Sequence, residues 1–511
     1  MVVQPATTYL LDLGDEAAVE RLRIVFQTVI VGCMSQSLGQ ATSGMFRRKP
    51  ISAEADSSLE RSIGLWQLTA IGLGAIIGAG IFALAGPVAK TDAGPAVSLS
   101  FLLAGFASAC AALSYAEFGG LIPQAGSAYT YGYTVLGEVV GWFIGWDLLL
   151  EYTAIVAVVA IGVSQYISFL LTALGLDLPV WMLGAPGSGD GHRVDLFAIL
   201  LCLGVAWLLN RGIKTSARIE TYLVFIKIAI VLAVIGVGVF YIKAENLTPY
   251  VPFGFSGVAT GAATVFFAVF GYDAMSTAAE ESKEAERNLP KAIVISLAIA
   301  MVLYLLAATV LTGMVKYTDL SETAAFSEAF SAVGRPEFAK VVAVGAIIGI
   351  ITVLFSFTLG ASRIWYSMSR DGLLPAWFAT TNKHHSPNRP VWIVGIVAAA
   401  LAGFVTIGTA AELTNIGILL AFVVVCAAVI VLRYRSPDLP RTFRVPFMPV
   451  VPLLGIGFSL WLTSQLMWET WARFGAWFLI GAVVYATYGY HHSKMNPGQS
   501  VTADPENELK G

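Results

Sequence analysis

The chain has 511 residues, of which 57% are hydrophobic and 12% are charged, and its formal net charge is −3. A soluble globular protein carries about 25% charged residues, and a soluble chain of this length has no way to hide so much apolar surface. These figures exclude an ordinary soluble enzyme and a disordered protein, and the charge balance gives no sign of nucleic-acid binding.

The first 60 residues are expected to form a poorly ordered cytoplasmic segment. Residues 22–38 are only moderately apolar, and they lack the charged start and the cleavage pattern of a signal peptide. Met45 is followed by Phe-Arg-Arg-Lys-Pro, which is typical of a cytoplasmic start. We therefore expect the native protein to begin at Met45.

Apolar runs long enough to cross a membrane follow one another from residue 66 to residue 491. A helix crosses the hydrocarbon core with about 20 mostly apolar residues, and these runs lack the alternation of a barrel strand. The sequence predicts an all-α integral membrane protein with a transporter domain at 61–490 and a cytoplasmic tail at 491–511. The twelve expected spans are 66–88, 95–118, 136–172, 194–210, 217–242, 256–279, 291–315, 338–369, 391–409, 412–432, 447–467 and 473–491.

Basic residues gather in alternate connections between the spans. The connection after the fourth span holds Arg211, Lys214 and Arg218, and the later even-numbered connections hold similar clusters. Odd-numbered connections hold few basic residues, such as Lys90 and Arg193. Because short loops rich in Lys and Arg stay in the cytoplasm, both termini are expected there.

Histidine and cysteine give no metal-binding or disulfide framework. All five histidines lie in polar stretches. The four cysteines, Cys33, Cys110, Cys202 and Cys426, are scattered and lie mostly in apolar runs. We expect free thiols packed in helices, with no metal site and no cofactor.

Glycines interrupt the first and the sixth span at corresponding places. The first span reads Gly-Leu-Gly-Ala-Ile-Ile-Gly-Ala-Gly over 72–80, and the sixth reads Phe-Phe-Ala-Val-Phe-Gly-Tyr-Asp over 266–273. These spans open two five-helix blocks, 66–242 and 256–432. Because five is odd, the second block enters the membrane from the opposite side, which predicts inverted repeats.

Breaks of this kind suit a binding site for a zwitterion. Unpaired peptide groups are tolerated at membrane depth only around a protected cavity. The N-terminus of a half-helix favours a carboxylate, and free carbonyls favour an ammonium group. An amino acid carries both groups. The alternative is that the glycines serve only close helix packing.

Five stretches resemble the amino acid–polyamine–organocation transporter superfamily. They are Gly74–Phe82, Ala116–Tyr129, Phe270–Glu281 with Asn288–Ile293, Arg363–Pro375, and Gly145–Tyr152, and the last is similar to the third helix of the cationic amino acid transporter family and its bacterial relatives. The resemblance covers about residues 60–490. It implies a five-plus-five inverted-repeat core, two extra C-terminal helices, alternating access around a midplane site, and the plasma (inner) membrane of a bacterium.

Carried over residue by residue, the resemblance places the substrate at the two breaks. The substrate carboxylate and amino groups would meet Ile76, Ile77, Gly78, Ala79 and Gly80. The sixth span would supply carbonyls and an aromatic gate from Phe267, Ala268, Phe270 and Gly271. Ala79 stands where many relatives have serine, which removes one hydroxyl but leaves the backbone donors.

Charged residues at membrane depth mark function by default. Lys227 resembles the fifth-helix lysine that occupies the space of a sodium ion in sodium-coupled relatives, so we expect it to carry a proton; structural pairing is the alternative. Ser356 and Thr358 are its expected partners. Glu151 is expected to contact a cationic substrate side chain or a backbone group, and Asp273 to cap backbone donors.

The expected function is import of L-amino acids by alternating access, coupled to protons, in a protein that is not an enzyme. The expected partners are the amino acid, a proton or sodium ion, and the lipid bilayer. Sodium coupling, uncoupled exchange of amino acids or polyamines, and facilitated diffusion stay open as alternatives. Cationic and neutral substrates also stay open, because Glu151 favours the first and Phe267, Phe270 and Ile77 favour the second.

Overall fold

The computed structural model describes residues 46–49, 63–122, 127–176, 178–211, 217–277, 282–380 and 387–495. The chain divides into two units, Met1–Arg47 and Arg48–Gly511, and the fold below is that of the second unit. The expected start at Met45 and most of the expected segment 1–60 lie outside the described residues.

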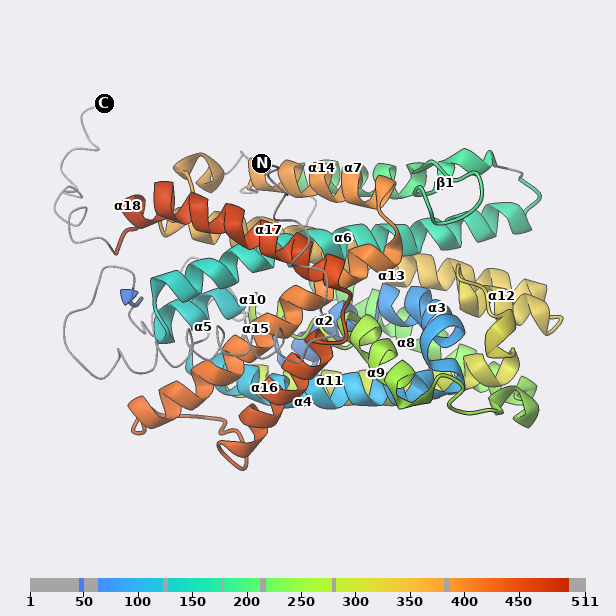
Figure 1. Ribbon diagram of the computed structural model, residues 1–511, viewed down its shortest axis with the longest axis horizontal. Coiled ribbons are helices and arrows are strands. Elements are labelled where there is room, and N and C mark those ends of the chain that lie inside the picture. Colours follow the sequence, from blue (N-terminus) through green and yellow to red (C-terminus); the bar gives the residue numbers. More distant parts are fainter. Residues whose placement is uncertain are drawn as a thin grey trace, which may run out of the picture. The chain divides into compact units, whose positions relative to one another are not determined.

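The described part of the second unit is built almost entirely from helices (Figure 1). Its first half contains α2 (Leu65–Ile76), η2 (Gly80–Leu84), α3 (Ala85–Val88), η3 (Ala89–Ala93), η4 (Gly94–Ala96), α4 (Val97–Leu121), α5 (Ser127–Val135), α6 (Glu138–Ala173), η5 (Val180–Met182), α7 (Leu196–Asn210), α8 (Ala217–Gly238), η6 (Val239–Tyr241) and η7 (Ala244–Leu247), where η marks a 3-10 or π turn. Its second half contains α9 (Gly254–Thr264), η8 (Val265–Val269), α10 (Ala274–Thr277), α11 (Ala285–Met314), η10 (Tyr317–Asp319), α12 (Ala325–Ala332), α13 (Pro336–Arg370), η11 (Ala376–Ala379), α14 (Asn388–Phe404), α15 (Ile407–Arg435), α16 (Val450–Thr463), α17 (Trp468–Val484), η12 (Tyr485–Gly489) and α18 (Tyr490–His492).

Helical segments lie in each of the twelve ranges that were expected to cross the membrane. Among the described residues, six helices are long and apolar enough to cross by themselves, or up to seven if the pair α16 and α17, bent by 111°, is one span. The stretch Leu65–Leu121 counts as one of the six, and Leu196–Asn210, Gly254–Val269 and Asn388–Phe404 are shorter apolar helices. The fold is therefore that of a helical membrane protein, and the number of twelve crossings stays a prediction.

One short hairpin departs from the all-α expectation. In the connection between α6 and α7, β1 (Leu183–Gly184) pairs antiparallel with β2 (Val194–Asp195). Asp195 then begins α7, because its carboxylate accepts a hydrogen bond from the Ala198 amide at 3.0 Å. A carboxylate at this position satisfies one of the amides that have no partner within the helix.

Long helices pack side by side through apolar and aromatic faces. α13 packs along α6, α11 along α4 and α14 along α7, and Figure 1 shows the last pair adjacent. α17 is joined to α6 by a reciprocal tryptophan pair. Trp146 and Trp477 stack with ring centroids 4.6 Å apart, and each indole N–H donates to the other residue's carbonyl at 2.9 and 3.0 Å.

The end of α13 joins segments from both ends of this unit. The Asp371 carboxylate accepts hydrogen bonds from Lys49 Nζ at 3.2 Å and from the Tyr129 hydroxyl at 2.8 Å. The Asp371 carbonyl accepts a hydrogen bond from the Lys494 amide at 3.1 Å. The first residues of the expected tail 491–511 are therefore packed against the helices, and residues 496–511 lie outside the described residues.

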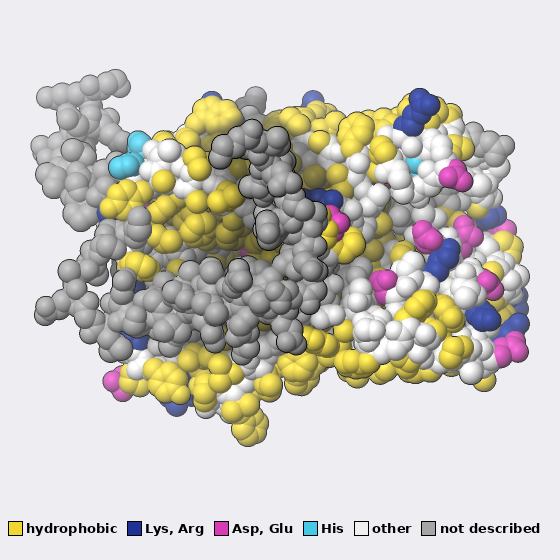
Figure 2. Space-filling model, in the orientation of Figure 1, with side chains coloured by type: hydrophobic (Ala, Val, Ile, Leu, Met, Phe, Trp, Pro, Cys, Tyr) yellow, Lys and Arg dark blue, Asp and Glu magenta, His cyan; other side chains and the backbone are white. Residues whose placement is uncertain are grey.

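Apolar side chains are also abundant on the surface. Figure 2 shows them over much of the visible face, whereas many acidic and basic side chains gather at the right-hand end of the view. Phe106 on α4, Phe225 on α8 and Leu479 on α17 are among the exposed large residues. Monomeric soluble proteins rarely expose so much contiguous apolar surface, whereas helices that face lipid require it. Cys110, Cys202 and Cys426 are buried free thiols, as expected, and Cys33 lies outside the described residues.

Candidate functional site

The first membrane helix loses its winding where the glycines lie. α2 ends at Ile76, Ile77 is extended with φ −75° and ψ 97°, and helical structure resumes with the π-helix Gly80–Leu84. All five residues proposed for this side of the site, Ile76–Gly80, are buried. Because the last carbonyls of an α-helix have no partner inside the helix, a buried break needs donors from elsewhere.

The sixth membrane helix is interrupted in a similar way. α9 tightens into the 3-10 helix Val265–Val269, Phe270 is extended with φ −102° and ψ 173°, and α10 begins at Ala274. Gly271 between them has φ +116°, a left-handed conformation that glycine adopts without strain. The four residues proposed for this side, Phe267, Ala268, Phe270 and Gly271, are also buried.

The two breaks touch each other through their glycines. A Cβ added at Gly80 would overlap Ala268. A Cβ added at Gly271 would lie 2.9 Å from the carbonyl carbon of Ala75 and 3.1 Å from the amide nitrogen of Ile76. The glycines therefore serve both the broken winding and the close packing that the sequence offered as alternatives, because the broken backbones pack directly on one another.

Buried donors bind the carbonyls at the end of α2. The Lys227 ammonium on α8 is 1% exposed and donates to Gly74 O at 2.7 Å and to Ile77 O at 3.0 Å. The Tyr304 hydroxyl on α11 donates to Ile76 O at 2.7 Å. Lys227 therefore brings its charge to the first break, where carbonyl oxygens stabilise a cation.

The two hydroxyl residues that were expected to accompany Lys227 lie on α13. Ser356 Oγ donates to Thr352 O at 3.0 Å, and Thr358 Oγ1 donates to Leu354 O at 2.6 Å, in each case one turn back in the same helix. Thr358 is buried and Ser356 is partly buried. Their role beside the ammonium stays a proposal.

The acidic residue Asp273 lies two residues after Gly271 of the sixth-helix break. Asp273 accepts hydrogen bonds from the Tyr152 hydroxyl and from Ser127 Oγ, the latter at 3.2 Å. Since Tyr152 lies on α6 and Ser127 on α5, Asp273 ties the segment after the break to both helices. These two donors are hydroxyl groups, and the expected capping of backbone donors by Asp273 stays a prediction.

Glu151 is fully buried on α6, and neither of its carboxyl oxygens has a hydrogen-bond partner among the described residues. Its Cβ lies 3.3 Å from the Cβ position of Gly417 on α15, and Asp147 Oδ1, one turn earlier on α6, lies 2.7 Å from that position. The two carboxyl groups therefore share the face of α6 that packs on α15. A charge at such a place is costly, and a proton or a cation removes that cost.

Aromatic rings surround the sixth-helix break. The Phe270 ring lies 6.5 Å from that of Phe357 on α13 and 5.8 Å from that of Phe422 on α15. The Phe357 ring also packs edge-on to Tyr152 at 5.1 Å. These contacts give the break an apolar wall. The sequence analysis named Phe270 but missed Phe357 and Phe422, because aromatic residues are common in every span.

Three polar residues near the breaks were also missed from the sequence. They are Tyr304, Ser108 and Asn415. Tyr304 donates a hydrogen bond to a carbonyl of the first break, Ser108 donates to a carbonyl of the second break, and Asn415 donates to a carbonyl of α9. Asn415 gave the clearest signal, because it is the last strongly polar residue of the span 412–432, after Glu412 and Thr414, and an apolar run follows it. Serine and tyrosine give no such signal, since both occur widely in apolar helices.

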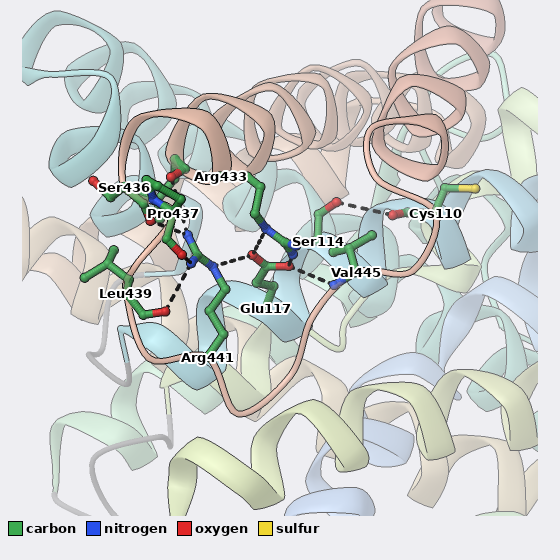
Figure 3. Close-up of polar contacts among 10 residues, drawn as sticks. Cys110, Ser114, Glu117, Arg433, Ser436, Pro437, Leu439, Arg441 and Val445 are labelled. Carbon is green, nitrogen blue, oxygen red and sulfur yellow. Dashed lines mark hydrogen bonds and ion pairs between the residues drawn. The ribbon is translucent and has the colours of Figure 1, made fainter.

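A separate charged cluster joins α4 to the loop between α15 and α16 (Figure 3). Glu117 is 2% exposed, and its carboxylate binds Arg433 and accepts hydrogen bonds from Arg441 Nε at 3.0 Å and the Val445 amide at 2.8 Å. Arg441 also donates to the carbonyls of Pro437, Leu439 and Ser436. The cluster fixes the loop to the end of α4.

Comparison with known proteins agrees with this architecture. The family model described as amino acid permease matches residues 63–488. The methylthioribose transporter of Bacillus subtilis (strain 168) is 45% identical over 459 residues, which cover 89% of this chain and 100% of that protein. The branched-chain amino acid permease BcaP of the same organism is 41% identical, over 88% of this chain and 99% of that protein.

Plant relatives are more distant. The vacuolar cationic amino acid transporter 4 of Arabidopsis thaliana is 35% identical over 409 residues, which cover 78% of this chain and 68% of that protein. The family match spans both breaks, Lys227 and the acidic residues, and its members are membrane transporters of small molecules rather than enzymes. This chain belongs to the amino acid permease family.

Proposed function

We propose that the protein imports L-amino acids across the plasma membrane of a bacterium by alternating access, coupled to protons, with both termini in the cytoplasm. The observation that carries the proposal is the pair of touching helix breaks at Ile77 and Phe270, with Lys227 bound to the carbonyls of the first. A soluble ligand with an ammonium and a carboxylate fits such a place because peptide groups of both polarities converge there.

The substrate groups are proposed to bind the peptide groups of the two breaks. The amides at Gly78, Ala79 and Gly80 lie at the start of the helix that follows the first break, where the helix dipole favours a carboxylate. The carbonyls of Phe267 and Ala268 lie in the 3-10 helix before the second break, where they favour an ammonium. Ile76, Ile77, Phe270 and Gly271 complete the proposed site.

The side-chain end of the substrate is proposed to be neutral and apolar. Phe270 and its neighbour Phe357 form an apolar wall at the sixth-helix break. A relative that is 41% identical is named a branched-chain amino acid permease, which agrees with that wall. Glu151 favours a cationic substrate, and relatives named cationic amino acid transporters keep that alternative open.

A second candidate substrate comes from the relative named a methylthioribose transporter, which is 45% identical. Such a molecule carries an apolar methylthio group, which suits the Phe270 wall, but it has neither a carboxylate nor an ammonium group. It would leave the proposed amide and carbonyl contacts of the breaks unused, and we therefore rank it second.

Two buried groups are suited to carry the coupling proton. Lys227 has its ammonium on the carbonyls of the first break, so loss of its proton would weaken the hold of α8 on α2, because a neutral amine is a weaker donor than an ammonium group. Glu151 has no hydrogen-bond partner among the described residues and would bind a proton from the outside before substrate release. Ser356 and Thr358 are proposed to assist Lys227.

Uptake by the purified protein in proteoliposomes tests the proposed function. Labelled leucine is offered with a proton gradient, with a sodium gradient, or with neither, and the twenty amino acids, methylthioribose and spermidine compete in turn. The proposal expects uptake stimulated by an acidic outside and inhibited most by neutral apolar amino acids. Uptake that requires sodium, or competition by methylthioribose alone, would contradict it.

A further inference from the structure

Each broken helix is held by a buried donor from a helix far along the chain. Lys227 on α8 binds the carbonyls of Gly74 and Ile77, which lie 153 and 150 residues earlier. Asn415 on α15 binds the carbonyls of Ala263 and Thr264, which lie 152 and 151 residues earlier, at 2.8 and 2.9 Å. Lys227 and Asn415 therefore lie at nearly the same distance along the sequence from the carbonyl groups that each of them binds.

A second pair of contacts repeats the pattern across the blocks. The carbonyl just before the extended residue of the first break, Ile76 O, accepts from the Tyr304 hydroxyl on α11 at 2.7 Å. The carbonyl just before the extended residue of the second break, Val269 O, accepts from Ser108 Oγ on α4 at 2.8 Å. α4 is the second long helix of the first expected block, and α11 is the second long helix of the second. Each of them binds the break of the other block, as inverted repeats predict.

The burial and the hydrogen bonds of Asn415 place it to hold the end of α9. It is fully buried, and its amide nitrogen donates to both carbonyls where α9 passes into the 3-10 helix. A buried carbonyl that loses its hydrogen-bond donor destabilises an apolar interior. Without Asn415, the turn that leads to Phe267 and Ala268 would lose these two hydrogen bonds to α15 and keep only its apolar contacts with that helix.

We propose that Asn415 is a positioning residue for transport, and that it is the second-block counterpart of Lys227. It holds the carbonyl end of α9 on α15, so the carbonyls of Phe267 and Ala268 stay directed at the substrate. An amide has no charge to lose, so this contact persists while the charge of Lys227 changes. The second break is then anchored permanently, and the hold on the first break weakens when Lys227 loses its proton. This inference rests on the proposed function.

Two substitutions distinguish the effect of losing the hydrogen-bond donor from the effect of changing the volume of the side chain. Asn415→Ala removes the donor, whereas Asn415→Asp keeps the shape and donates only when the acid is protonated. Asn415 Oδ1 has no hydrogen-bond partner among the described residues, so the second substitution breaks no known contact at that atom. Thr414→Val is the matched control, because the Thr414 hydroxyl is equally buried but donates to Ala410 O of its own helix.

Leucine counterflow at equal pH on both sides is the transport readout. Asn415→Ala is expected to raise the KM by about tenfold or more, with a smaller change in the maximal rate. Asn415→Asp should resemble it at about pH 8 and recover toward the wild type at about pH 5, since a protonated carboxyl group donates a hydrogen bond. Thr414→Val should stay within about twofold of the wild type.

Hydrogen exchange in the substrate-free full chain gives a readout that needs no transport. Asn415→Ala is expected to speed exchange at the amides of residues 265–271 and leave those of the α2 break unchanged. Unchanged exchange at 265–271, an unchanged KM, or an Asn415→Asp variant that is equally impaired at both pH values would overturn the proposal. If the wild type takes up no amino acid, the proposed function fails, and the exchange result still decides the role of Asn415.

Discussion

Lys227 is the residue on which the proposed site depends most. Its ammonium is nearly inaccessible to solvent and replaces lost helix hydrogen bonds at Gly74 and Ile77. Hydrogen bonds from a charged donor are about twice as strong as neutral ones, so this contact fixes the end of α2.

Lys227→Ala is expected to lower amino acid counterflow by about tenfold or more, because two carbonyls of the first break lose their donor. Counterflow in proteoliposomes, with the reconstituted protein quantified, measures the effect. Lys340→Ala is the control, since Lys340 forms only a surface pair with Glu337 at 2.9 Å. Equal loss in both variants, or none in Lys227→Ala, would remove Lys227 from the site.

Glu117→Gln tests the cluster in Figure 3. Glutamine keeps the shape but removes the charge between Arg433 and Arg441, and breaking such a buried pair costs about 3 kcal/mol. We expect the apparent melting temperature in detergent to fall by several degrees. Glu337→Gln, at an exposed pair, should change stability by less than about 1 kcal/mol. A stable Glu117→Gln variant would show that the cluster holds no loop in place.

At this scale the sequence singled out buried charged residues, but it did not predict their partners. Lys227 and Glu151 are evident because charge is rare in an apolar span. Asn415 and Tyr304 were missed, because polar side chains in helices often bond only to their own helix. The partners of Glu117 lie 316 and 324 residues away, and no local pattern encodes such a contact.

At the scale of the element, the close packing of the two helix breaks against each other determines how the two broken helices are placed. Gly271 combines a left-handed backbone with a 2.9 Å approach to Ala75, so it meets two requirements that other residues fail. The two breaks can pack this closely only because each contributes a glycine, Gly80 in the first and Gly271 in the second.

Gly271→Ala is expected to abolish counterflow and to lower stability by about 1–3 kcal/mol, because the methyl group strains the backbone and presses on Ala75. Gly204→Ala is the matched control. Gly204 lies inside α7 with no atom near its Cβ position, so alanine should leave stability equal or raise it by about 1 kcal/mol. Melting curves and counterflow of both variants check this. An active and stable Gly271→Ala protein would contradict the close packing of the two breaks.

The elements themselves were largely predictable, and their ends were not. Hydropathy located helical segments in all twelve expected ranges, because lipid demands long apolar runs. The ninth range was expected to end at 409, whereas α14 ends at Phe404 and α15 begins at Ile407. Thr406 causes the difference, because its hydroxyl accepts a hydrogen bond from the Thr409 amide and caps α15. The hairpin β1–β2 was missed because its strands are two residues long.

At the scale of the whole molecule, coupling requires that a proton and the substrate bias the same conformational change. Glu151 packs against Gly417 of α15, and α15 holds the sixth-helix break through Asn415. The proton proposed to bind Glu151 would therefore act at the helix that anchors one side of the proposed site.

Glu151→Gln is expected to keep leucine counterflow and to lose the stimulation of net uptake by an acidic outside, because glutamine imitates the protonated acid. Net uptake with and without a pH gradient measures the difference. Lys227→Ala should instead lose both activities. If Glu151→Gln keeps its full response to the gradient, the proton does not bind at Glu151.

The most direct measurement is a structure of the protein with leucine bound. The account predicts the leucine carboxylate at the amides of Gly78–Gly80, its ammonium at the carbonyls of Phe267 and Ala268, and its side chain beside Phe270. Leucine bound away from both breaks, or a first helix that runs unbroken through Ile77 in the bound state, would contradict the account.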